Sequence, residues 1–565
     1  MTERSTLSYA HGVSTAPLIG ETVGVHFDRT ISRWRDRPAL VVSQQGVRWT
    51  WGELAARVDA FAAGLLALGL EPGDRVGIWS PNNAEWVVTQ FATAKAGLIL
   101  VNINPSYRLA ELEYALNKVG CRALITATRF KASDYVGMVA SLAPELAASA
   151  PGRLAAVKLP ELRTVIQVGG PTVAGAIPFA SVAGLAGEAE RGRLQELART
   201  LQFDDPINIQ FTSGTTGLPK GATLTHHNIL NNGFFIGERM HYTEHDKVCI
   251  PVPLYHCFGM VIGNLACLTH GSTIVLPGEG LDPLATLRTV AEERCTSLYG
   301  VPTMFIAELD HPEFASFDLT SLRTGMMAGS PCPIEVMRRC VKDMNLTEMT
   351  IGYGMTETSP VQTMTLIGDP IEKQTGTVGC AMAHVEIKIV DGDGRLVPRG
   401  MPGEICARGY SVMLGYWNDP ERTAEVIDSS GWMHTGDLAT MDTDGYCNIV
   451  GRIKDMVIRG GENVYPREIE EFLYRHPAIL DVQVFGVPDA RYGEELCAWI
   501  RRRPGQMLDE AEIKAFCQGQ IAHYKVPRYV RFVDEFPMTV TGKVQKFIMR
   551  DKMMEELGVP AQRTA

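Results

Sequence analysis

The chain has 565 residues, with 53 Lys and Arg against 64 Asp and Glu, so its formal net charge is −11. This length predicts two to four domains or subdomains. A 45% apolar content with 21% charged residues is typical of an ordinary globular protein, and it excludes intrinsic disorder, a collagen-like chain and a disulfide scaffold. The acidic total argues against nucleic acid as a partner, because proteins that bind it usually present a concentrated basic face.

The twelve cysteines are scattered singly, without a C-x-x-C pair. This spacing predicts reduced thiols and a cytoplasmic location, and the first residues lack the apolar segment of a signal peptide. The longest stretch without Asp, Glu, Lys or Arg, 248–278, is interrupted by prolines and polar residues. It predicts a strand, a helix, a turn and a strand, so we expect no integral membrane segment.

Helical and strand patterns alternate through the first three hundred residues. Thr50 and Glu53 have the spacing of a capping box, and apolar residues then recur at helical intervals. A strand at 75–79, a helix at 84–96 and an apolar strand at 98–103 follow. Together they predict a βαβ crossover in a parallel sheet that is buried on both faces.

A second series of the same kind follows farther along the chain. It comprises a strand at 248–253, a helix near Leu265, a strand at 273–276, a helix at 283–292 and a strand at 296–299. Between the two series, residues 137–200 are rich in Ala, Gly and Pro, and we expect an irregular excursion there.

The composition and the predicted secondary structure change twice in the last third of the sequence. Residues 375–450 contain short β-like segments separated by Gly, Asp and Pro, which favours a small β-rich subdomain. From about residue 453, a helix starting near Pro466 and a following strand predict a compact α+β domain. We therefore divide the chain into a large domain, 1–452, which includes the β-rich subdomain, and a small domain, 453–565.

Residues 212–221 read TSGTTGLPKG, with three glycines among four hydroxyl side chains and one lysine. Glycines let backbone N–H groups approach an anion closely, and hydroxyls and an ammonium add donors, so the segment suits a phosphate-binding loop. It is not the G-x-x-x-x-G-K-[ST] P-loop, since Lys220 is followed by Gly221. Taken alone, such a run is also compatible with a flexible linker.

Five motifs in this order resemble the adenylate-forming superfamily of acyl- and aryl-CoA synthetases, amino-acid adenylation domains and beetle luciferases. They are TSGTTGLPKGA at 212–222, YGMTET at 353–358, GWMHTGD at 431–437, GRIKD at 451–455 with GGENVYP at 460–466, and TGK at 541–543. The resemblance covers nearly the whole chain. It is closest to bacterial fatty acyl-CoA synthetases of the medium- to long-chain type.

The resemblance implies an α/β plus α+β fold. The large N-terminal domain would consist of parallel-sheet αβαβα subdomains with a small β-barrel-like subdomain. The C-terminal α+β domain would be small and mobile, rotating about Lys454 between two half-reactions. In the first, a carboxylic acid and ATP would give acyl-AMP and pyrophosphate; in the second, the acyl group would pass to the thiol of coenzyme A.

The same resemblance implies a nucleotide site. A phosphate loop would be formed by Thr212, Ser213, Gly214, Thr215, Thr216, Gly217 and Lys220. Adenine would lie against Gly329, Ser330, Pro331 and Tyr353. Asp437 would accept hydrogen bonds from the two ribose hydroxyls, which suits an acceptor-only carboxylate, and Arg452 would support this contact.

Further residues are implied in the chemistry itself. Thr356 would contact the α-phosphate, and Glu357 would hold Mg²⁺ together with Thr212. Lys543 would reach the α-phosphate and the substrate carboxylate. Two more features would serve the thiol: Gly460 and Gly461 would lie beside the pantetheine tunnel, and His256 would border the acyl pocket and gate that tunnel.

The acid is predicted from the segment PLYHCFGMVIG at 253–263, which contains no carboxylate to pair with an α-amino group. An amino acid is therefore disfavoured. Small and apolar residues at 299–303 and 328–329 suit an aliphatic or simple aromatic tail. An aryl-CoA ligase and transfer to a carrier-protein pantetheine stay open as alternatives.

The expected partners are a small carboxylic acid, ATP and CoA, and a homodimer stays open. A luciferase-like oxygenase is disfavoured because nothing in the sequence singles it out. A non-catalytic binding protein is disfavoured because Lys543, Glu357 and Asp437 are all present. Two histidine groups, His226-His227 and His241/His245, lack a third ligand at suitable spacing, so we expect no histidine metal site.

Overall fold

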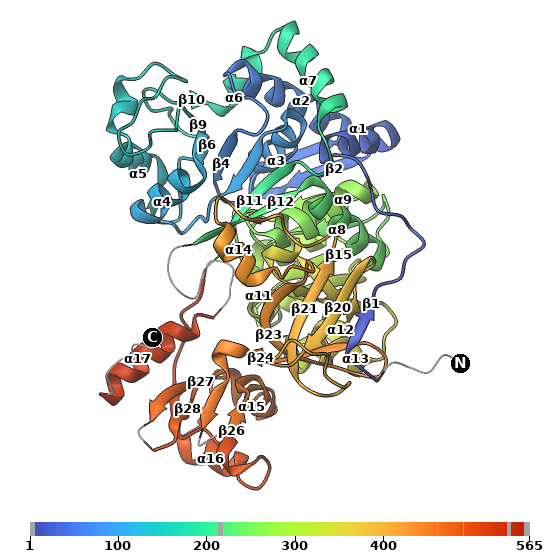
Figure 1. Ribbon diagram of the computed structural model, residues 1–565, viewed down its shortest axis with the longest axis vertical. Helices are drawn as coiled ribbons and strands as arrows, with labels where there is room; N and C mark the ends of the chain where they lie inside the picture. The colour runs from blue at the N-terminus through green and yellow to red at the C-terminus, as the bar shows by residue number, and fades with distance from the viewer. Residues whose placement is uncertain are drawn as a thin grey trace.

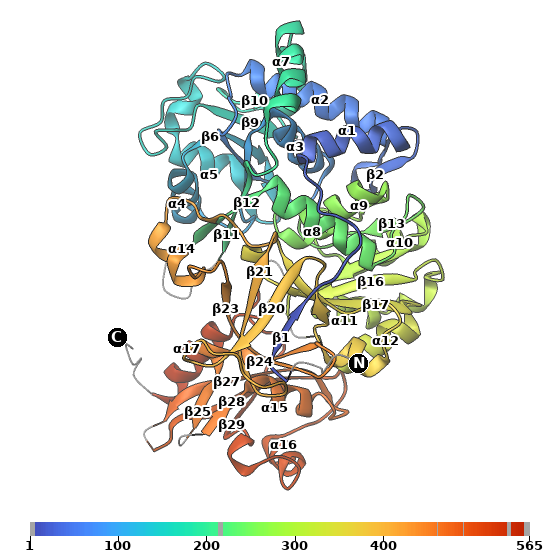
Figure 2. The same ribbon diagram turned by 45° about the vertical axis from the view of Figure 1, so that its right-hand side comes forward.

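The structure, a computed structural model, describes residues 6–212, 219–330, 332–459, 462–489, 491–539 and 544–558, without the side chains of Lys454 and Asn463. Two large sheets and their helices form the upper body in Figure 1, and the C-terminal segment forms the lowest part. The view in Figure 2 shows an antiparallel sheet between these two parts.

The first large sheet has a parallel centre. Its order is β10 (Ile177–Pro178), β9 (Thr164–Val168), β6 (Cys121–Ala127), β4 (Arg75–Trp79), β5 (Ile99–Asn102), β11 (Pro206–Thr212), β12 (Lys220–Thr225) and β22 (Gly415–Tyr416). Helix α3 (Ala84–Ala96) connects β4 to its parallel neighbour β5, as predicted. Leu100 packs in one core whereas Ile99 and Val101 pack in another, so β5 is buried on both faces.

The second large sheet also has a parallel centre. Its order is β19 (Cys380–Ala381), β18 (Val361–Met364), β17 (Glu348–Gly354), β16 (Thr324–Ala328), β15 (Ser297–Gly300), β13 (Lys247–Cys249), β14 (Thr273–Leu276), β2 (Pro38–Val42) and β3 (Val47–Thr50). The predicted strands at 273–276 and 296–299 and the helix at 283–292 are confirmed as β14, β15 and α10 (Pro283–Glu293).

The predicted strand at 248–253 is shorter in the structure, because β13 ends at Cys249. Pro251 and Pro253 follow, and proline has no N–H to donate to a sheet. The helix expected near Leu265 consists of a π-helix, η4 (Phe258–Leu265), continued by α9 (Ala266–His270).

Helices pack against both sheets and join them through one core. That core includes residues of β4, β5, β13 and β14. Helix α2 (Trp51–Ala67) starts at the predicted capping box: the Thr50 hydroxyl accepts from the Glu53 amide, and the Glu53 carboxylate accepts from the Thr50 amide. Helices α1 (Val23–Trp34) and α8 (His226–Arg239) also contribute buried residues to this core.

Residues 137–200 are more regular than predicted. They contain most of α5 (Tyr135–Leu142), the parallel strand β9, and the 13-residue helix α7 (Glu188–Thr200). The irregular-excursion prediction is therefore wrong for these elements. The five residues of β9 gain their structure by pairing with β6, a long-range contact that local composition does not reveal.

The β-rich subdomain is an open antiparallel sheet. Its order is β1 (Tyr9–His11), β20 (Val385–Val390), β21 (Gly403–Gly409), β23 (Met433–Met441) and β24 (Cys447–Arg452). Strands β1 and β24 are the edges, so the sheet is not closed into a barrel among the described residues. The N-terminal strand β1 joins it from the far end of the sequence.

The C-terminal segment forms its own α+β unit, seen at the bottom of Figures 1 and 2. Its sheet contains β25 (Val457–Arg459), β26 (Glu462–Val464), β27 (Ile479–Asp489), β28 (Gly493–Arg502) and β29 (Tyr529–Phe532). Its helices are α15 (Pro466–Leu473), α16 (Glu510–Cys517) and α17 (Lys546–Leu557). Two separate apolar clusters hold it together, which confirms the fold class predicted for this part.

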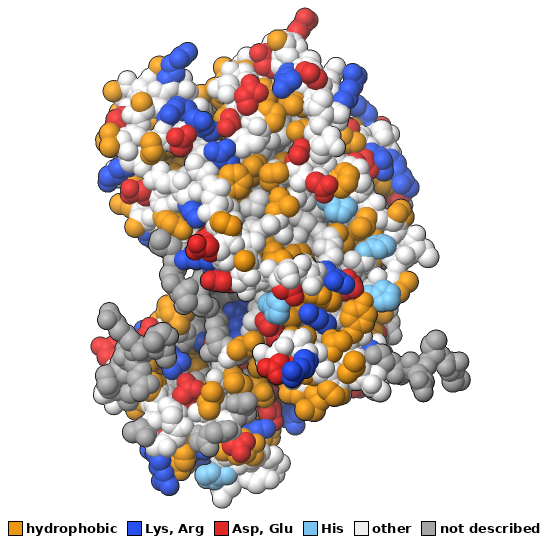
Figure 3. Space-filling model, viewed as in Figure 1, with side chains coloured by type: hydrophobic (Ala, Val, Ile, Leu, Met, Phe, Trp, Pro, Cys, Tyr) orange, Lys and Arg blue, Asp and Glu red, His pale blue; other side chains and the backbone are white. Residues whose placement is uncertain are grey.

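Within the described residues, no helix is both long and apolar enough to cross a membrane. All twelve cysteines are free thiols. On the face drawn in Figure 3, basic and acidic side chains are interspersed rather than gathered into separate fields.

Candidate active site

The two ends of the predicted phosphate loop are held by a hairpin. Strands β11 and β12 pair antiparallel, and Thr212 at the end of β11 lies opposite Lys220 at the start of β12. The predicted residues Ser213, Gly214, Thr215, Thr216 and Gly217 lie outside the described residues. The hairpin therefore fixes where the loop leaves and re-enters the first sheet.

Glu357 meets this hairpin from the second sheet. It lies with Thr356 on a short 3₁₀ turn (Thr356–Thr358) just after β17, and both residues are buried. Oε1 of Glu357 accepts hydrogen bonds from Oγ1 of Thr212, at 3.1 Å, and from the hydroxyl of Tyr416, at 2.9 Å. The predicted pair Thr212 and Glu357 is thus in direct contact.

Tyr416 is a residue of this cluster that the sequence did not predict. It lies on β22, which pairs with β12. Nζ of Lys220 is 4.7 Å from the centroid of its ring, a cation–π distance. Burial and the neighbouring Glu357 raise the pKa of the Tyr416 hydroxyl, so this group stays a hydrogen-bond donor to the carboxylate. No local motif surrounds it; only the pairing of β22 brings it here.

A second cluster joins three predicted residues. Asp437 and Arg452 are opposite each other on β23 and β24, with 3.2 Å between Nε of Arg452 and Oδ1 of Asp437. The Tyr353 hydroxyl, at the end of β17, donates to Oδ2 of Asp437 at 2.7 Å. Burial and the Asp437 charge raise the pKa of Tyr353. The carboxylate is therefore held between a cation and a hydroxyl.

The predicted adenine segment follows β16. Gly329 has φ of +89°, a left-handed conformation that favours glycine. The Cys332 thiol donates to the carbonyl of Ser330 at 3.4 Å. Pro331 lies outside the described residues, as do Gly460, Gly461 and Lys543; the side chain of the predicted hinge residue Lys454 is also not described.

His256 lies two residues before the π-helix η4 and is half-buried. Its Nδ1 accepts a hydrogen bond from the Phe258 amide at 3.1 Å. A backbone amide can only donate, so the hydrogen of the neutral ring is on Nε2.

Glu357 and Thr212 suit a magnesium ion whose remaining ligands come mainly from the nucleotide phosphates and water. Carboxylate and hydroxyl oxygens are hard ligands of the kind Mg²⁺ prefers. Among the described residues, three metal-type ligands come together at Glu404, Cys406 and His434 and not around Glu357. A cation on Glu357 would therefore take its remaining ligands from phosphate oxygens and water, as Mg²⁺ commonly does.

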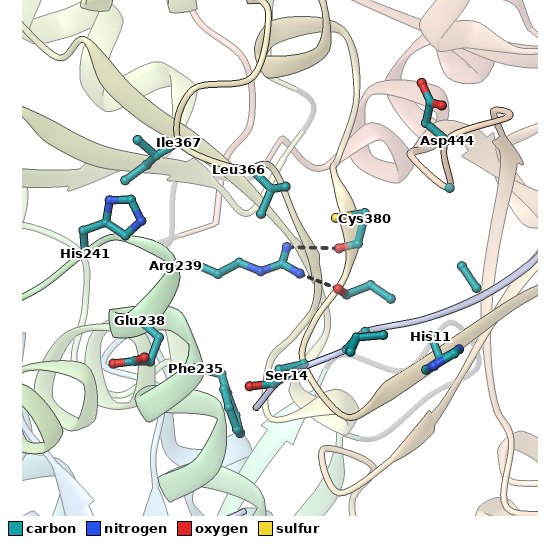
Figure 4. A pocket seen from close by; sticks show the side chains of 16 residues that line it. His11, Ser14, Phe235, Glu238, Arg239, His241, Leu366, Ile367, Cys380 and Asp444 are labelled. Carbon is teal, nitrogen blue, oxygen red and sulfur yellow. Dashed lines mark hydrogen bonds between the residues drawn. The ribbon is translucent and has the colours of Figure 1, made fainter. Parts of the chain in front are cut away.

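A cavity of about 560 Å³ lies elsewhere, beside Phe235, Glu238 and Arg239 at the end of α8. Figure 4 shows the Arg239 guanidinium directed at backbone carbonyls, including that of Cys380. None of the predicted site residues lines this cavity, so it is not part of the candidate active site.

The chain is similar to known proteins over nearly its full length. It is 50% identical to the zebrafish (Danio rerio) protein named medium-chain acyl-CoA ligase ACSF2, mitochondrial, over 98% of this chain and 92% of that protein. It is 48% identical to YngI of Bacillus subtilis, over 96% of this chain and 98% of YngI.

Among solved structures, MatB from Rhodopseudomonas palustris is 30% identical and covers 94% of this chain and 99% of its own. The TM-score is 0.81 for the ATP-bound form and 0.71 for the apo form. Two family models match: the AMP-binding enzyme model over residues 27–417 and the AMP-binding enzyme C-terminal domain model over residues 468–543. The chain therefore belongs to the AMP-binding enzyme family, the adenylate-forming enzymes that its motifs resemble.

Proposed function

We propose that this protein is an AMP-forming acid–CoA ligase, with a carboxylic acid, ATP and CoA as substrates. The observation that carries the proposal is the full-length likeness to a relative named medium-chain acyl-CoA ligase, at 50% identity over 98% of this chain. The two side-chain clusters around Glu357 and Asp437 support it. Oxygen ligands for a metal ion meet at Glu357, and the Tyr353 hydroxyl contacts the acceptor carboxylate of Asp437.

In the first half-reaction, a carboxylate oxygen of the acid attacks the α-phosphorus of ATP. The bond between that phosphorus and the bridging oxygen breaks, and pyrophosphate leaves. The phosphate loop between Thr212 and Lys220 holds the β- and γ-phosphates, and Thr356 contacts the α-phosphate. Lys543 approaches the α-phosphate and the carboxylate, and its charge offsets the repulsion of two anions; loss of one such stabiliser typically costs on the order of 10²–10³ in rate.

The nucleoside is held by the second cluster. Adenine lies against the segment Gly329–Pro331 and the Tyr353 ring. Asp437 accepts from the ribose hydroxyls, and Arg452, 3.2 Å from this carboxylate, keeps it oriented. Because Tyr353 donates to Asp437 at 2.7 Å, one hydrogen bond links the adenine contact to the ribose contact.

Glu357 and Thr212 would hold Mg²⁺, which would offset charge on the phosphate oxygens when bound. The Glu357 carboxylate is preorganised for this role, since Thr212 and Tyr416 both donate to one of its oxygens.

In the second half-reaction, the CoA thiolate attacks the carbonyl carbon of acyl-AMP, the thioester forms, and AMP leaves with the bonding electron pair. We place this step on the same large domain, 1–452, after the small domain, 453–565, has turned about Lys454. Gly460 and Gly461 then border the pantetheine tunnel, which His256 gates.

The comparison with MatB supports the adenylating arrangement for the described structure. The two MatB structures have the same identity and coverage, but the TM-score is 0.81 for one and 0.71 for the other. The higher score belongs to the ATP-bound form. We therefore assign the described position of the small domain to acyl-AMP formation.

We propose a medium- to long-chain fatty acid as the substrate, and the name of the zebrafish relative supports the medium-chain part of this range. An aryl acid, or carrier-protein pantetheine as the acceptor, is the alternative. YngI is a bacterial protein, which supports a cytoplasmic location, whereas the name of the zebrafish relative includes "mitochondrial". A homodimer stays a prediction.

A panel of straight-chain acids from C2 to C16 and aryl acids tests the function. AMP release is measured with each acid, with ATP, CoA and Mg²⁺ omitted in turn. We expect release with C6–C12 acids that requires all three. AMP release with none of the acids would contradict the proposal, and release with aryl acids alone would favour the alternative.

A further inference from the structure

Three buried amide side chains form a connected chain between β5 and β11. Asn102 lies on β5, and Asn208 and Gln210 lie on β11; each is at most 3% exposed. Nδ2 of Asn208 donates to Oδ1 of Asn102 at 3.0 Å, and Nε2 of Gln210 donates to Oδ1 of Asn208 at 2.8 Å. We call these three residues the amide triad.

Both ends of the amide triad hold the chain on either side of His256. Nδ2 of Asn102 donates to the carbonyl of Tyr255 at 2.8 Å. The thiol of Cys257 donates to Oε1 of Gln210 at 3.2 Å. His256 is the single residue between these two anchored neighbours, so the position of its backbone is tied to the two strands.

The segment after His256 needs support from other elements. A π-helix is rare and usually short, and it recurs at functional sites. Two carbonyls of η4 accept side-chain hydrogen bonds: that of Met260 from Nε2 of Gln90, and that of Ile262 from the Tyr299 hydroxyl, each at 3.1 Å. The Met260 sulfur also lies 3.2 Å from Nδ2 of Asn102 and from Nε2 of Gln210.

Burying the three amide side chains in the sheet is unfavourable in itself, because a buried polar group costs free energy unless its hydrogen bonds are satisfied. Apolar residues would fill the interior of a parallel sheet at lower cost. A satisfied polar network fixes geometry more strictly than apolar packing does. Gln210 also lies two residues before Thr212 on the same strand, so the network connects the phosphate-loop strand to the His256 segment.

We propose that Asn102, Asn208 and Gln210 are positioning residues that hold His256 in register with the phosphate-loop strand. This inference rests on the proposed function, in which His256 borders the acyl pocket and the thiol tunnel. The amide triad is buried and acts through its hydrogen bonds to the segment around His256. It keeps the position of the ring relative to Thr212 fixed while the small domain changes its position.

Hydrogen–deuterium exchange tests the tether without any assay of activity. The variant is Gln210→Met, which keeps the length of the side chain and removes the amide. The matched control is Gln167→Met in the same sheet; Gln167 is 2% exposed and bonds its own loop at Gly169 and Pro171. We expect exchange in peptides covering 253–265 to rise by about tenfold in Gln210→Met and to be unchanged in the control. Unchanged exchange in both variants would overturn the proposal.

A double-mutant cycle then tests whether the effect passes through His256. In the wild-type background, Gln210→Met is expected to lower thioester formation by about tenfold or more, since small misplacements of reacting groups are costly. In a His256→Ala background, the same change should cost less than about twofold. Equal losses in both backgrounds would overturn the proposal, even if exchange rises.

A milder variant covers the case in which Gln210→Met does not fold. Cys257→Ala removes only the thiol donor to Gln210, and it should show a smaller change of the same pattern in both experiments. A wild-type enzyme without acyl-CoA activity would contradict the proposed function instead, and the exchange result would still decide whether the tether exists.

Discussion

Glu308 is a buried acid whose removal should change the pH dependence of stability. It lies on α11 (Pro302–Leu309), is 1% exposed, and neither of its carboxylate oxygens has a hydrogen-bond partner among the described residues. Burial raises its pKa well above the ordinary value of 4.5. As the pH rises above 4.5, the folded protein therefore keeps a proton on Glu308 that the unfolded chain releases.

The sign and the magnitude follow from this difference in bound protons. Below pH 4.5 both states are protonated, so the group costs nothing electrostatically. Above it, the unfolded state gains stability from ionisation, and the folded protein loses about 1.4 kcal/mol per pH unit until the pH reaches the folded-state pKa. Glu308→Gln has nearly the same shape and cannot ionise, so it removes this loss.

The assay is urea unfolding of the wild type and of Glu308→Gln at pH 5, 6, 7 and 8, with Glu421→Gln as the control at an exposed site. We expect the free energy of unfolding of Glu308→Gln to rise relative to the wild type from pH 5 upward until the pH reaches the folded-state pKa of Glu308, and that of the control to stay parallel to the wild type. A difference between Glu308→Gln and the wild type that is constant across this range would refute the reasoning.

Three further predictions concern the two half-reactions. Tyr416→Phe removes a donor to Glu357 and should lower ATP–pyrophosphate exchange by about tenfold, with the loss partly restored at high Mg²⁺; an unchanged Mg²⁺ dependence would remove Tyr416 from the ion site. Lys543→Ala should abolish acyl-AMP formation while conversion of supplied acyl-AMP and CoA to thioester continues, and equal loss of both steps would contradict its assignment. Lys454→Pro restricts φ at the proposed hinge and should impair thioester formation more than pyrophosphate release; if the two fall together, the hinge lies elsewhere.

Local patterns in the sequence predicted local structure well. The capping box at Thr50, the βαβ unit from β4 to β5 and the helix start at Pro466 all depend on residues near one another in the chain. They predicted the fold class for the same reason, since alternating strands and helices leave few arrangements. The motif residues Thr212 and Glu357, 145 positions apart, were also predicted to share a site, and they are in contact.

Pairing between strands that are far apart in the sequence could not be predicted from local patterns. Strand β1 joins β20 across more than 370 residues, and β22 brings Tyr416 to Glu357 by pairing with β12. The amide triad did leave a signal, since Asn208 and Gln210 interrupt an otherwise apolar strand. Their partner Asn102 comes from another strand, however, so the network could be recognised only once β5 and β11 were known to be neighbours.

The central claim is that the carboxylate attacks the α-phosphorus of ATP, and isotope transfer tests it most directly. A fatty acid labelled with ¹⁸O at both carboxylate oxygens is incubated with the enzyme, ATP, Mg²⁺ and CoA, and the products are analysed by mass spectrometry. We predict one ¹⁸O in each AMP, one in the thioester carbonyl and none in pyrophosphate. AMP without the label, or ADP with labelled phosphate, would contradict it.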